Sequence, residues 1–326
     1  MAGDALGKQL SGLYANGSNW SVQDFTTVGS YTSWTVPSGT QRMAILAIGG
    51  GGGGSSGSPS TANGTWSGGG GGGGGGSIFV SDIDVSLYAG SNLFITVGAG
   101  GAGTSGQNNP GSNGALSGVA LSSSGPYFAY GNGGTGGGAY STGSGVATTP
   151  TGSATGVGGL GVIVSAPSNT SGLLSFLSGI NLTTQSTIYK WNGGAGGQAT
   201  GGSSNVPTDG GYCSIGAYSL PTIFSVGANG TGTRGGVASV PGFGGGGGAG
   251  GNSNTTALPA TGSIGVHGGG AGGGGGQTST SSGAGGAGAA NTGGGGGGGG
   301  TNISSSAITL IGGNGGSGRV IIWYRA

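Results

Sequence analysis

Short segments with the hydrophobic patterning of β-strands recur along most of the chain. Residues 41–48 form an almost continuous apolar run that leads directly into glycines. Residues 78–87 alternate almost strictly, so Phe79 and Ile83 are predicted to share one face of a strand and Val80 to lie on the other. The pattern predicts a mainly β protein. Further candidate strands are residues 22–28, 31–36, 92–97, 161–165, 187–191, 221–226, 307–311 and 319–324.

The first twenty residues differ from this pattern. Leu6, Leu10 and Leu13 have the spacing of one helix face, i, i+4 and i+7, and Asp4 is placed to cap such a helix. Two glycines between Leu6 and Leu13 weaken this helix. Residues 1–20 are therefore either a frayed terminus or a short attachment segment that becomes ordered on a partner protein.

Glycine supplies 97 of the 326 residues and is concentrated in runs between the β-type segments. Ordering a glycine costs roughly 0.5–1 kcal/mol more than ordering an alanine, so the whole set adds on the order of 50–100 kcal/mol. The chain therefore either stays disordered or builds a structure that requires glycine. The runs include residues 49–54, 68–76, 244–248, 268–276 and 293–300.

The rest of the composition favours an ordered chain. Lys and Arg supply six residues and Asp and Glu five, for a formal net charge of +1, whereas disordered chains are usually highly charged. Five Trp, ten Tyr and seven Phe are also more aromatic side chains than a disordered linker carries. A collagen helix is excluded because the G-X-Y register is absent and only ten prolines occur.

An extended glycine run can form a left-handed helix of the polyproline II type, with a rise of about 3.1 Å per residue. Residues 68–76 would then span roughly 28 Å. Since this helix has no internal hydrogen bonds, it needs neighbouring backbones at a distance that only glycine permits on every side. We therefore predict a small β-sandwich or jelly-roll-like framework with packed polyglycine II helices, long irregular loops and little or no α-helix. Flexible glycine linkers are the alternative.

One internal repeat is visible. Residues 97–106 (VGAGGAGTSG) match residues 226–235 (VGANGTGTRG) at seven of ten positions, and each copy follows a segment that contains Phe. We predict that residues 21–326 form one glycine-rich domain of β-strands and polyglycine helices, or two related units over 21–160 and 161–326.

The sequence lacks the residue constellations that enzymes and cofactor sites use. Glutamate is absent, Cys213 is the only cysteine, and His267, the only histidine, has no acidic residue near it in the sequence. Asp82 and Asp84 are spaced to hold Ca²⁺ or to act as paired carboxylates, but a solvated strand face is the simpler interpretation. We expect no enzyme activity, no metal and no cofactor.

Charge and hydropathy exclude two further classes of partner. The six Lys and Arg residues are scattered, whereas binding to nucleic acids and anionic membranes requires clusters of them. The longest apolar run without glycine, residues 43–48, is far too short to cross a bilayer. No signal peptide is visible, so we expect synthesis in the cytoplasm and assembly into an external structure.

Aromatic side chains between the glycine runs are the remaining candidates for a binding site. Rings with nearby Asn and Ser combine stacking area with hydrogen bonding and suit sugars or protein loops. A chain with few Leu and Ile also needs aromatic rings to fill its β core, so packing is the alternative for each of them. The candidate binding residues are Trp66, Tyr127, Phe128, Tyr130, Tyr140 and Trp191.

Three stretches of the chain carry a recognisable pattern: residues 25–54, residues 75–103 and residues 312–325. Together they resemble the glycine-rich domain of bacteriophage tail-fibre and fibre-tip proteins, which contains polyglycine II helices. The match brackets residues 23–325, although residues 107–221 have no familiar pattern. A similar combination of a β-sandwich and polyglycine helices occurs in certain receptor tyrosine kinases, so the resemblance bears more directly on architecture than on function.

The resemblance implies a virion protein of a fibre or tail tip, made in the host cytoplasm, that binds a host-cell-surface glycan or outer-membrane protein. Its other partners would be fibre, tail or capsid proteins, with Leu6, Leu10 and Leu13 as the attachment residues. Phage fibres are commonly trimers whereas related adhesin tips can be monomers, so a homotrimer and a monomer both stay open. A purely structural fibre, spike or decoration subunit is one alternative, and a non-viral structural protein is another.

Overall fold

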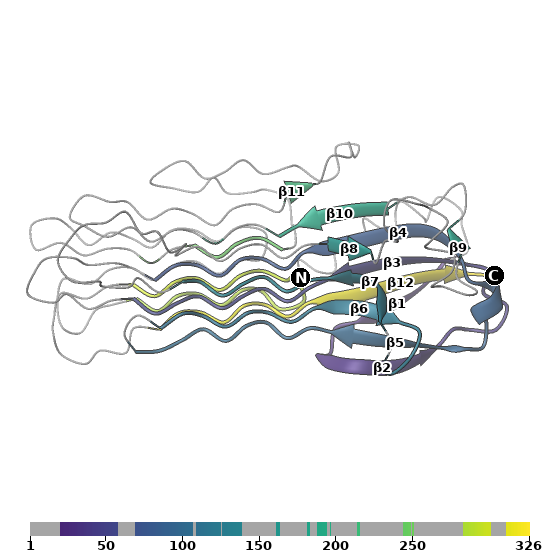
Figure 1. The fold of residues 1–326 in the computed structure, drawn as a ribbon, viewed down its shortest axis with the longest axis horizontal. Helices are drawn as coiled ribbons and strands as arrows, with labels where there is room; N and C mark the ends of the chain where they lie inside the picture. The colour runs from purple at the N-terminus through teal and green to yellow at the C-terminus, as the bar shows by residue number, and fades with distance from the viewer. Residues whose placement is uncertain are drawn as a thin grey trace, which may run out of the picture.

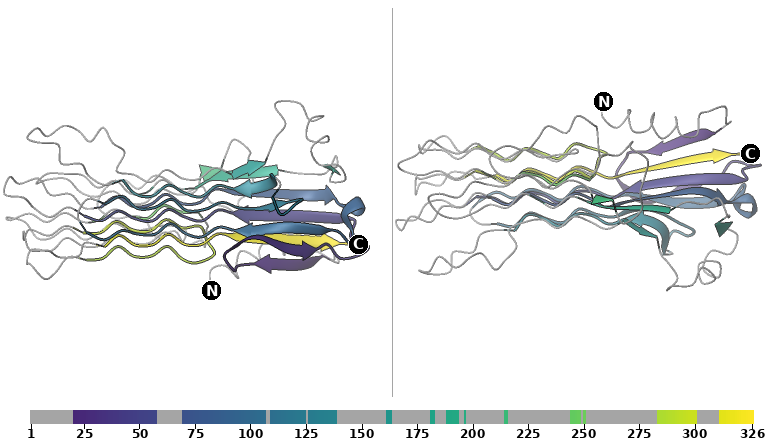
Figure 2. Two further views of the ribbon diagram at one scale, coloured as in Figure 1. Left: turned by 60° about the horizontal axis from the view of Figure 1, so that its bottom comes forward. Right: turned by 90° about the horizontal axis from the view of Figure 1, so that it is seen from above.

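Figure 1 shows that the chain has two parts, a group of β-strands and a set of extended segments that continue from them. The strands gather at the end that holds the C-terminus, and glycine segments run away from them as wavy traces. These traces stay side by side in both views of Figure 2, so they form a bundle along the long axis, here called the polyglycine bundle. The computed structural model describes residues 20–57, 69–106, 109–124, 126–138, 161–163, 181–182, 188–193, 196, 214–215, 244–248, 250, 283–300 and 311–326.

The described strands form two antiparallel sheets, one of seven strands and one of five. Sheet A contains, in spatial order, β1 (Ser21–Phe25), β12 (Arg319–Arg325), β3 (Arg42–Ile48), β4 (Ser77–Asp84), β10 (Ile188–Asn192) and β11 (Ser214–Ile215), with β9 (Asn181–Leu182) paired to β4. Sheet B contains β2 (Gly29–Thr35), β5 (Asn92–Val97), β6 (Ser117–Ala120), β7 (Tyr127–Gly131) and β8 (Gly161–Ile163). In this part of the chain the only helical turn is Ser86–Tyr88. The predicted mainly β fold is confirmed.

The two sheets pack against each other over one apolar core. Because alternate side chains of a strand point to opposite faces, Leu46 of β3 and Trp323 of β12 point away from this core. Both are nevertheless fully buried, so sheet A is covered on its two faces. This explains why residues 41–48 are a continuous apolar run instead of an alternating one. The core includes Ile45, Ile78, Val80, Ile83, Leu93, Ile95, Val119, Phe128, Val320 and Ile322.

Strand β4 contains a bulge that changes the faces predicted from its alternating sequence. Val80 and Ile83 both lie in the core, whereas strict alternation places them on opposite faces. The pairing of β4 with β3 shifts register between Met43 and Ile45, and Asp82 has a left-handed φ of 48°. Since a bulge adds one residue to one strand, it reverses the face of each later side chain. The predicted separation of Val80 from Ile83 is therefore wrong.

The last strand of the chain lies inside sheet A and not at its edge. β12 pairs with β1 on one side and with β3 on the other. Arg319 at the start of β12 donates from Nε to Oδ1 of Asp24 at 2.8 Å and from Nη2 to Oδ2 of the same carboxylate. This ion pair joins β12 to β1 where the sheet meets the polyglycine bundle. Sheet A thus combines strands from residues 21–160 with strands from residues 161–326, the two units considered from the sequence.

The polyglycine bundle continues the strands directly. β3 runs into residues 49–57, the central segment of the bundle. The backbone N–H groups of this segment donate in turn to three antiparallel neighbours, and its carbonyl groups accept from three parallel neighbours, at N···O distances of 2.8–3.3 Å. Successive bonds to one neighbour come from every third residue, as three residues per turn require. These bonds are those of packed polyglycine II helices, which the sequence predicted. The six neighbours are residues 69–76, 109–115 and 312–316, then 98–104, 132–137 and 293–299.

Side chains at the surface of the bundle occur where a segment faces solvent. Ala99 and Ala102, three residues apart, are exposed, whereas Gly101 between them is buried. A Cβ on Gly101 would lie 2.0 Å from the carbonyl oxygen of Ser112, a distance that no side chain tolerates. The period of three therefore decides which positions of a segment must be glycine.

The side chain of Ser55 is buried inside the bundle. Its Oγ accepts a 2.7 Å hydrogen bond from the backbone N–H of Gly70 and donates to the carbonyl oxygen of Gly138 at 3.0 Å. Replacing Ser55 with alanine is expected to lower the free energy of unfolding by about 1–3 kcal/mol, because a buried N–H loses its acceptor. Denaturant unfolding of the parent and the variant measures this loss. The exposed Ser112→Ala change is the control, with an expected effect within about 0.5 kcal/mol, and equal losses in both variants would contradict the prediction.

Candidate functional site

Four of the six candidate binding residues lie in described strands, and the other two lie outside the described residues. Three of them, Tyr127, Phe128 and Tyr130, lie on β7, in a strand and not in a loop. Trp191 lies on β10, of which the backbone is described. Outside the described residues are Trp66, Tyr140, Leu6, Leu10 and Leu13.

A bulge in β7 brings two tyrosines to one face of sheet B. The register of β7 with β6 shifts between Val119 and Ala120, so Phe128 occupies the core side, where it is 6% exposed. Tyr127 and Tyr130 are half-buried and lie on the opposite, outer side. Residues three apart on a regular strand would point to opposite faces. The bulge is therefore what places both hydroxyphenyl rings on the outer face.

A second bulge, in β2, adds a third tyrosine to the same face. The pairing of β2 with β5 shifts register between Gly29 and Thr32. Tyr31 inside this bulge has a φ of 53°, in the left-handed region that residues other than Gly and Asn rarely adopt. Its backbone N–H donates to Oγ1 of Thr96 on β5 at 3.0 Å. This bond holds the strained residue in place and directs its ring across sheet B.

These residues form a compact group, here called the tyrosine cluster: Tyr31, Tyr127, Tyr130 and Thr96. The rings of Tyr31 and Tyr127 stack with centroids 5.3 Å apart and planes 13° from parallel. The rings of Tyr127 and Tyr130 lie 6.1 Å apart and tilted by 53°. The hydroxyl of Tyr127 forms a 2.8 Å hydrogen bond with Oγ1 of Thr96. The cluster thus joins β2, β5 and β7 across the outer face of sheet B.

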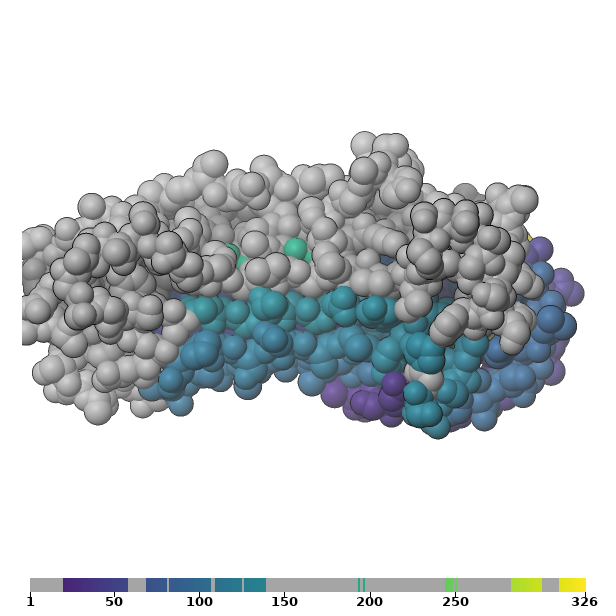
Figure 3. Space-filling model, in the orientation of Figure 1, coloured from purple at the N-terminus to yellow at the C-terminus, as the bar shows by residue number. Residues whose placement is uncertain are grey.

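Glycine on the intervening strand makes room for the cluster. Gly118 of β6 pairs with Tyr130 on one side and with Thr96 on the other. A Cβ on Gly118 would lie only 2.5 Å from Cβ of Tyr130. On the face shown in Figure 3, purple atoms of the segment that contains β2 lie at the surface beside teal atoms of the segment that contains β6 and β7.

The sequence predicted part of the cluster and missed the rest. Tyr127 and Tyr130 were candidates because they are aromatic and lie between glycine runs. Tyr31 was read as part of a strand, and Thr96 carried no signal at all. The pairing of β2 with β5 spans sixty-five residues between Tyr31 and Thr96, so local pattern could not reveal it. The one available signal was the GSY sequence before Thr32, since glycine in a strand often marks a bulge.

Burial raises the pKa of Tyr127 above its ordinary value of 10, with the neighbouring Tyr31 adding to the rise and the Thr96 hydrogen bond opposing it. A raised pKa favours the protonated phenol in the folded state. The associated stability is present below pH 10 and is lost as the pH rises through the folded-state pKa. We expect the difference in phenolate absorbance between the parent and Tyr127→Phe to report one phenol that titrates above pH 10. A midpoint at or below pH 10 would contradict this.

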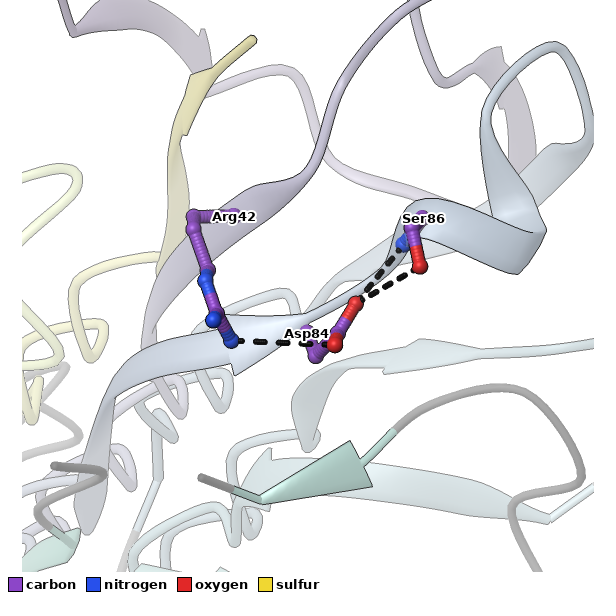
Figure 4. A network of polar contacts seen from close by, with 3 residues as sticks. All are labelled: Arg42, Asp84 and Ser86. Atoms are coloured by element: carbon purple, nitrogen blue, oxygen red, sulfur yellow. Dashed lines mark hydrogen bonds and ion pairs between the residues drawn. The ribbon is translucent and has the colours of Figure 1, made fainter. Parts of the chain in front are cut away.

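A polar network on sheet A involves Asp84, one of the two aspartates considered as metal ligands from sequence. Figure 4 shows Asp84 between Ser86 and Arg42. Oδ1 of Asp84 accepts hydrogen bonds from the Ser86 backbone N–H at 3.1 Å and from its hydroxyl at 2.8 Å, and Oδ2 lies 3.8 Å from Nη1 of Arg42. The Ser86 bonds, with a smaller effect of Arg42, hold the pKa of Asp84 below its ordinary value of 3.8. The carboxylate is thus engaged in a turn at the end of β4.

The described ranges show neither a metal centre nor a membrane-spanning helix. In that part of the chain, no three His, Cys, Asp or Glu side chains are grouped as metal ligands would be. No helix in the same residues has the length and apolar character that a membrane span needs.

Two antiparallel sheets that extend into a bundle of polyglycine helices define a glycine-rich β protein. Comparison with known families agrees with this class. The glycine-rich domain family matches residues 26–212, which is more than half of the chain, and the protein belongs to that family. No curated protein matches the chain significantly.

Proposed function

We propose that this protein is a bacteriophage fibre or tail-tip protein that attaches the virion to the surface of its host cell. Its partners would be other fibre, tail or capsid proteins on one side and a host glycan or outer-membrane protein on the other. The observation that supports this proposal best is the polyglycine bundle. Its geometry suits a protein that holds contact surfaces away from a particle.

The bundle behaves as a stiff spacer. Segment 49–57 has six hydrogen-bonded neighbours, so bending it would break bonds on every side. At about 3.1 Å per residue, its nine residues extend roughly 28 Å beyond the end of β3. The chain turns back at the far end, where Oγ1 of Thr104 donates to the carbonyl of Asn109 at 2.7 Å. A rigid rod with a chain reversal at its tip is a suitable shape for an attachment protein.

The composition of the bundle also fits a structure that works outside a cell. Its cohesion comes from backbone hydrogen bonds, which every residue supplies, and needs neither bound metal nor charged side chains. The described ion pairs, Arg319 with Asp24 and Arg42 with Asp84, lie in the sheets. Changes in salt or divalent ions outside a cell would therefore leave the bundle largely unaffected.

Competition for adsorption tests the proposal. The purified chain, added in increasing amounts to host cells, should lower the adsorption rate of the phage that encodes it, while the heat-denatured chain should not. Antibodies against the chain should label fibres or tail tips in electron micrographs. Labelled fibres without competition would overturn the attachment role and favour a purely structural subunit. Absence of label from the particle would overturn both roles.

A further inference from the structure

We propose that the tyrosine cluster on the outer face of sheet B is a binding site for a neutral saccharide. Nothing in the family match assigns a function to this face. The inference rests on the proposed attachment function only in suggesting where the saccharide comes from, namely the host surface. The site itself is argued from the geometry of Tyr31, Tyr127 and Tyr130 and from the charge of the strands around them.

Two separate bulges turn tyrosines to the same face of sheet B. Each bulge interrupts ladder hydrogen bonds, and the left-handed φ of Tyr31 adds backbone strain of about 1–3 kcal/mol. The core gains nothing from these rings, since Tyr31, Tyr127 and Tyr130 lie on the side away from it. Bulges that re-aim side chains are frequent next to functional sites. The β7 bulge also serves the core by placing Phe128 in it, but the strained Tyr31 of the β2 bulge lies away from the core, so its cost indicates a benefit elsewhere.

The chemistry that the cluster presents also suits a sugar. Three half-buried phenol rings supply flat apolar area, and their hydroxyls supply donors and acceptors at its edge. A pyranose ring has the matching properties, a face of C–H groups and a rim of hydroxyls. Stacking through Tyr31 and Tyr127 also fixes the rings before a ligand binds, which lowers the entropy cost of binding.

The described strands of sheet B are uncharged. Its five strands read GSYTSWT, NLFITV, SGVA, YFAYG and GVI, and none contains Asp, Glu, Lys, Arg or His. The charged residues of the described strands all belong to sheet A, from Asp24 on β1 to Arg325 on β12. An acidic sugar or a phosphate would find no cation on sheet B to offset its desolvation. The site therefore favours neutral saccharides.

The outer face offers room for more than one sugar unit. Along β2 and β5, the same face continues to the exposed pair Thr35 and Asn92, joined by a 2.8 Å hydrogen bond. Phe94, half-buried, lies between this pair and Thr96 on β5. An aromatic ring flanked by polar side chains at both ends suits a chain of two or more sugars better than a monosaccharide.

Glycan-array binding by the purified full chain tests the inference, with neutral and acidic oligosaccharides printed side by side. We expect retention on neutral oligosaccharides and a tenfold or greater loss of affinity in Tyr127→Ala and Tyr130→Ala, because each removes stacking area. Tyr127→Phe keeps the ring and should bind better than Tyr127→Ala. The matched control is Tyr324→Ala, which removes a half-buried tyrosine from sheet A and should bind like the parent. Circular dichroism of each variant confirms folding.

Several outcomes would overturn the proposal. They are retention on acidic sugars alone, no retention on any neutral sugar, and equal affinity in Tyr127→Ala and Tyr324→Ala with both variants folded. The adsorption competition separates this inference from the attachment role. Competition that survives Tyr127→Ala and Tyr130→Ala would leave attachment standing and remove the saccharide site from it. Neutral-sugar binding through the cluster without any competition would do the reverse.

Discussion

Replacing Gly53 with alanine is expected to lower the free energy of unfolding by more than about 4 kcal/mol, or to prevent folding altogether. Gly53 lies in the central segment of the polyglycine bundle. Its N–H donates to the carbonyl of Ser112 at 2.9 Å, and its carbonyl accepts from the N–H of Gly137 at 2.8 Å. A Cβ at this position would lie 2.1 Å from the carbonyl oxygen of Ala102. The obstructing atoms belong to the backbone, so no rotamer change can relieve the overlap.

The size of this effect follows from the way the segments are linked. To admit the methyl group of alanine at Gly53, residues 98–104 would have to move away from the central segment. That movement would lengthen the hydrogen bonds from Gly101 to Gly51 and from Thr104 to Gly54. The gain from a less flexible unfolded chain, about 0.4–1 kcal/mol for a glycine-to-alanine change, is too small to compensate. Overlap and lost bonds both act against the variant.

Thermal and denaturant unfolding of the purified variant measure the loss, and soluble yield reports it if the variant does not fold. The matched control is Ala102→Ser on the neighbouring segment, where the side chain is exposed. This change should leave stability within about 0.5 kcal/mol of the parent. A Gly53→Ala protein that unfolds at the same denaturant concentration as Ala102→Ser would show that the bundle is less tightly packed than described.

Removing the carboxylate of Asp24 is expected to cost about 2–3 kcal/mol. Its partner Arg319 is 7% exposed and donates two hydrogen bonds to this carboxylate. Asp24→Ala takes both away from a guanidinium that stays buried. The Asp24 side chain is itself 37% exposed, which places the loss below that of a fully buried ion pair. Denaturant unfolding at neutral pH measures it.

The second ion pair of the sheets is the natural control. Arg42 and Asp84 are 3.8 Å apart with side chains 33% and 36% exposed, and Asp84→Asn keeps an acceptor for the Ser86 bonds, so this change should cost no more than about 1 kcal/mol. A double variant, Asp24→Ala with Arg319→Met, should recover part of the Asp24→Ala loss because no buried charge is then left. Equal losses for Asp24→Ala and Asp84→Asn, or no recovery in the double variant, would contradict the burial argument.

The architecture could be predicted from sequence because its causes are local. A run such as residues 49–54 excludes side chains over two helical turns, and only packed backbones satisfy its hydrogen bonds. The apolar run 41–48 and the closing segment 319–324 are equally direct signals, and both form strands of sheet A at nearly the predicted bounds. The strand expected at 78–87 ends earlier, at Asp84, because Ser86–Tyr88 forms a helical turn.

Faces and partners, in contrast, depended on tertiary structure. Three bulges, in β2, β4 and β7, each shift a strand by one residue, and one residue is enough to move a side chain from the core to the surface. Whether a bulge forms depends on the strand opposite, which can lie sixty-five residues away, as with Tyr31 and Thr96.

The sequence by itself therefore determined that this protein combines strands with polyglycine helices, because steric freedom and hydrophobic period are properties of short segments. Only the tertiary structure decided that Tyr31, Tyr127 and Tyr130 meet on an uncharged sheet face. It also decided that β12, the last strand, lies inside sheet A between β1 and β3. Both depend on pairing between distant segments, which residue pattern alone does not encode.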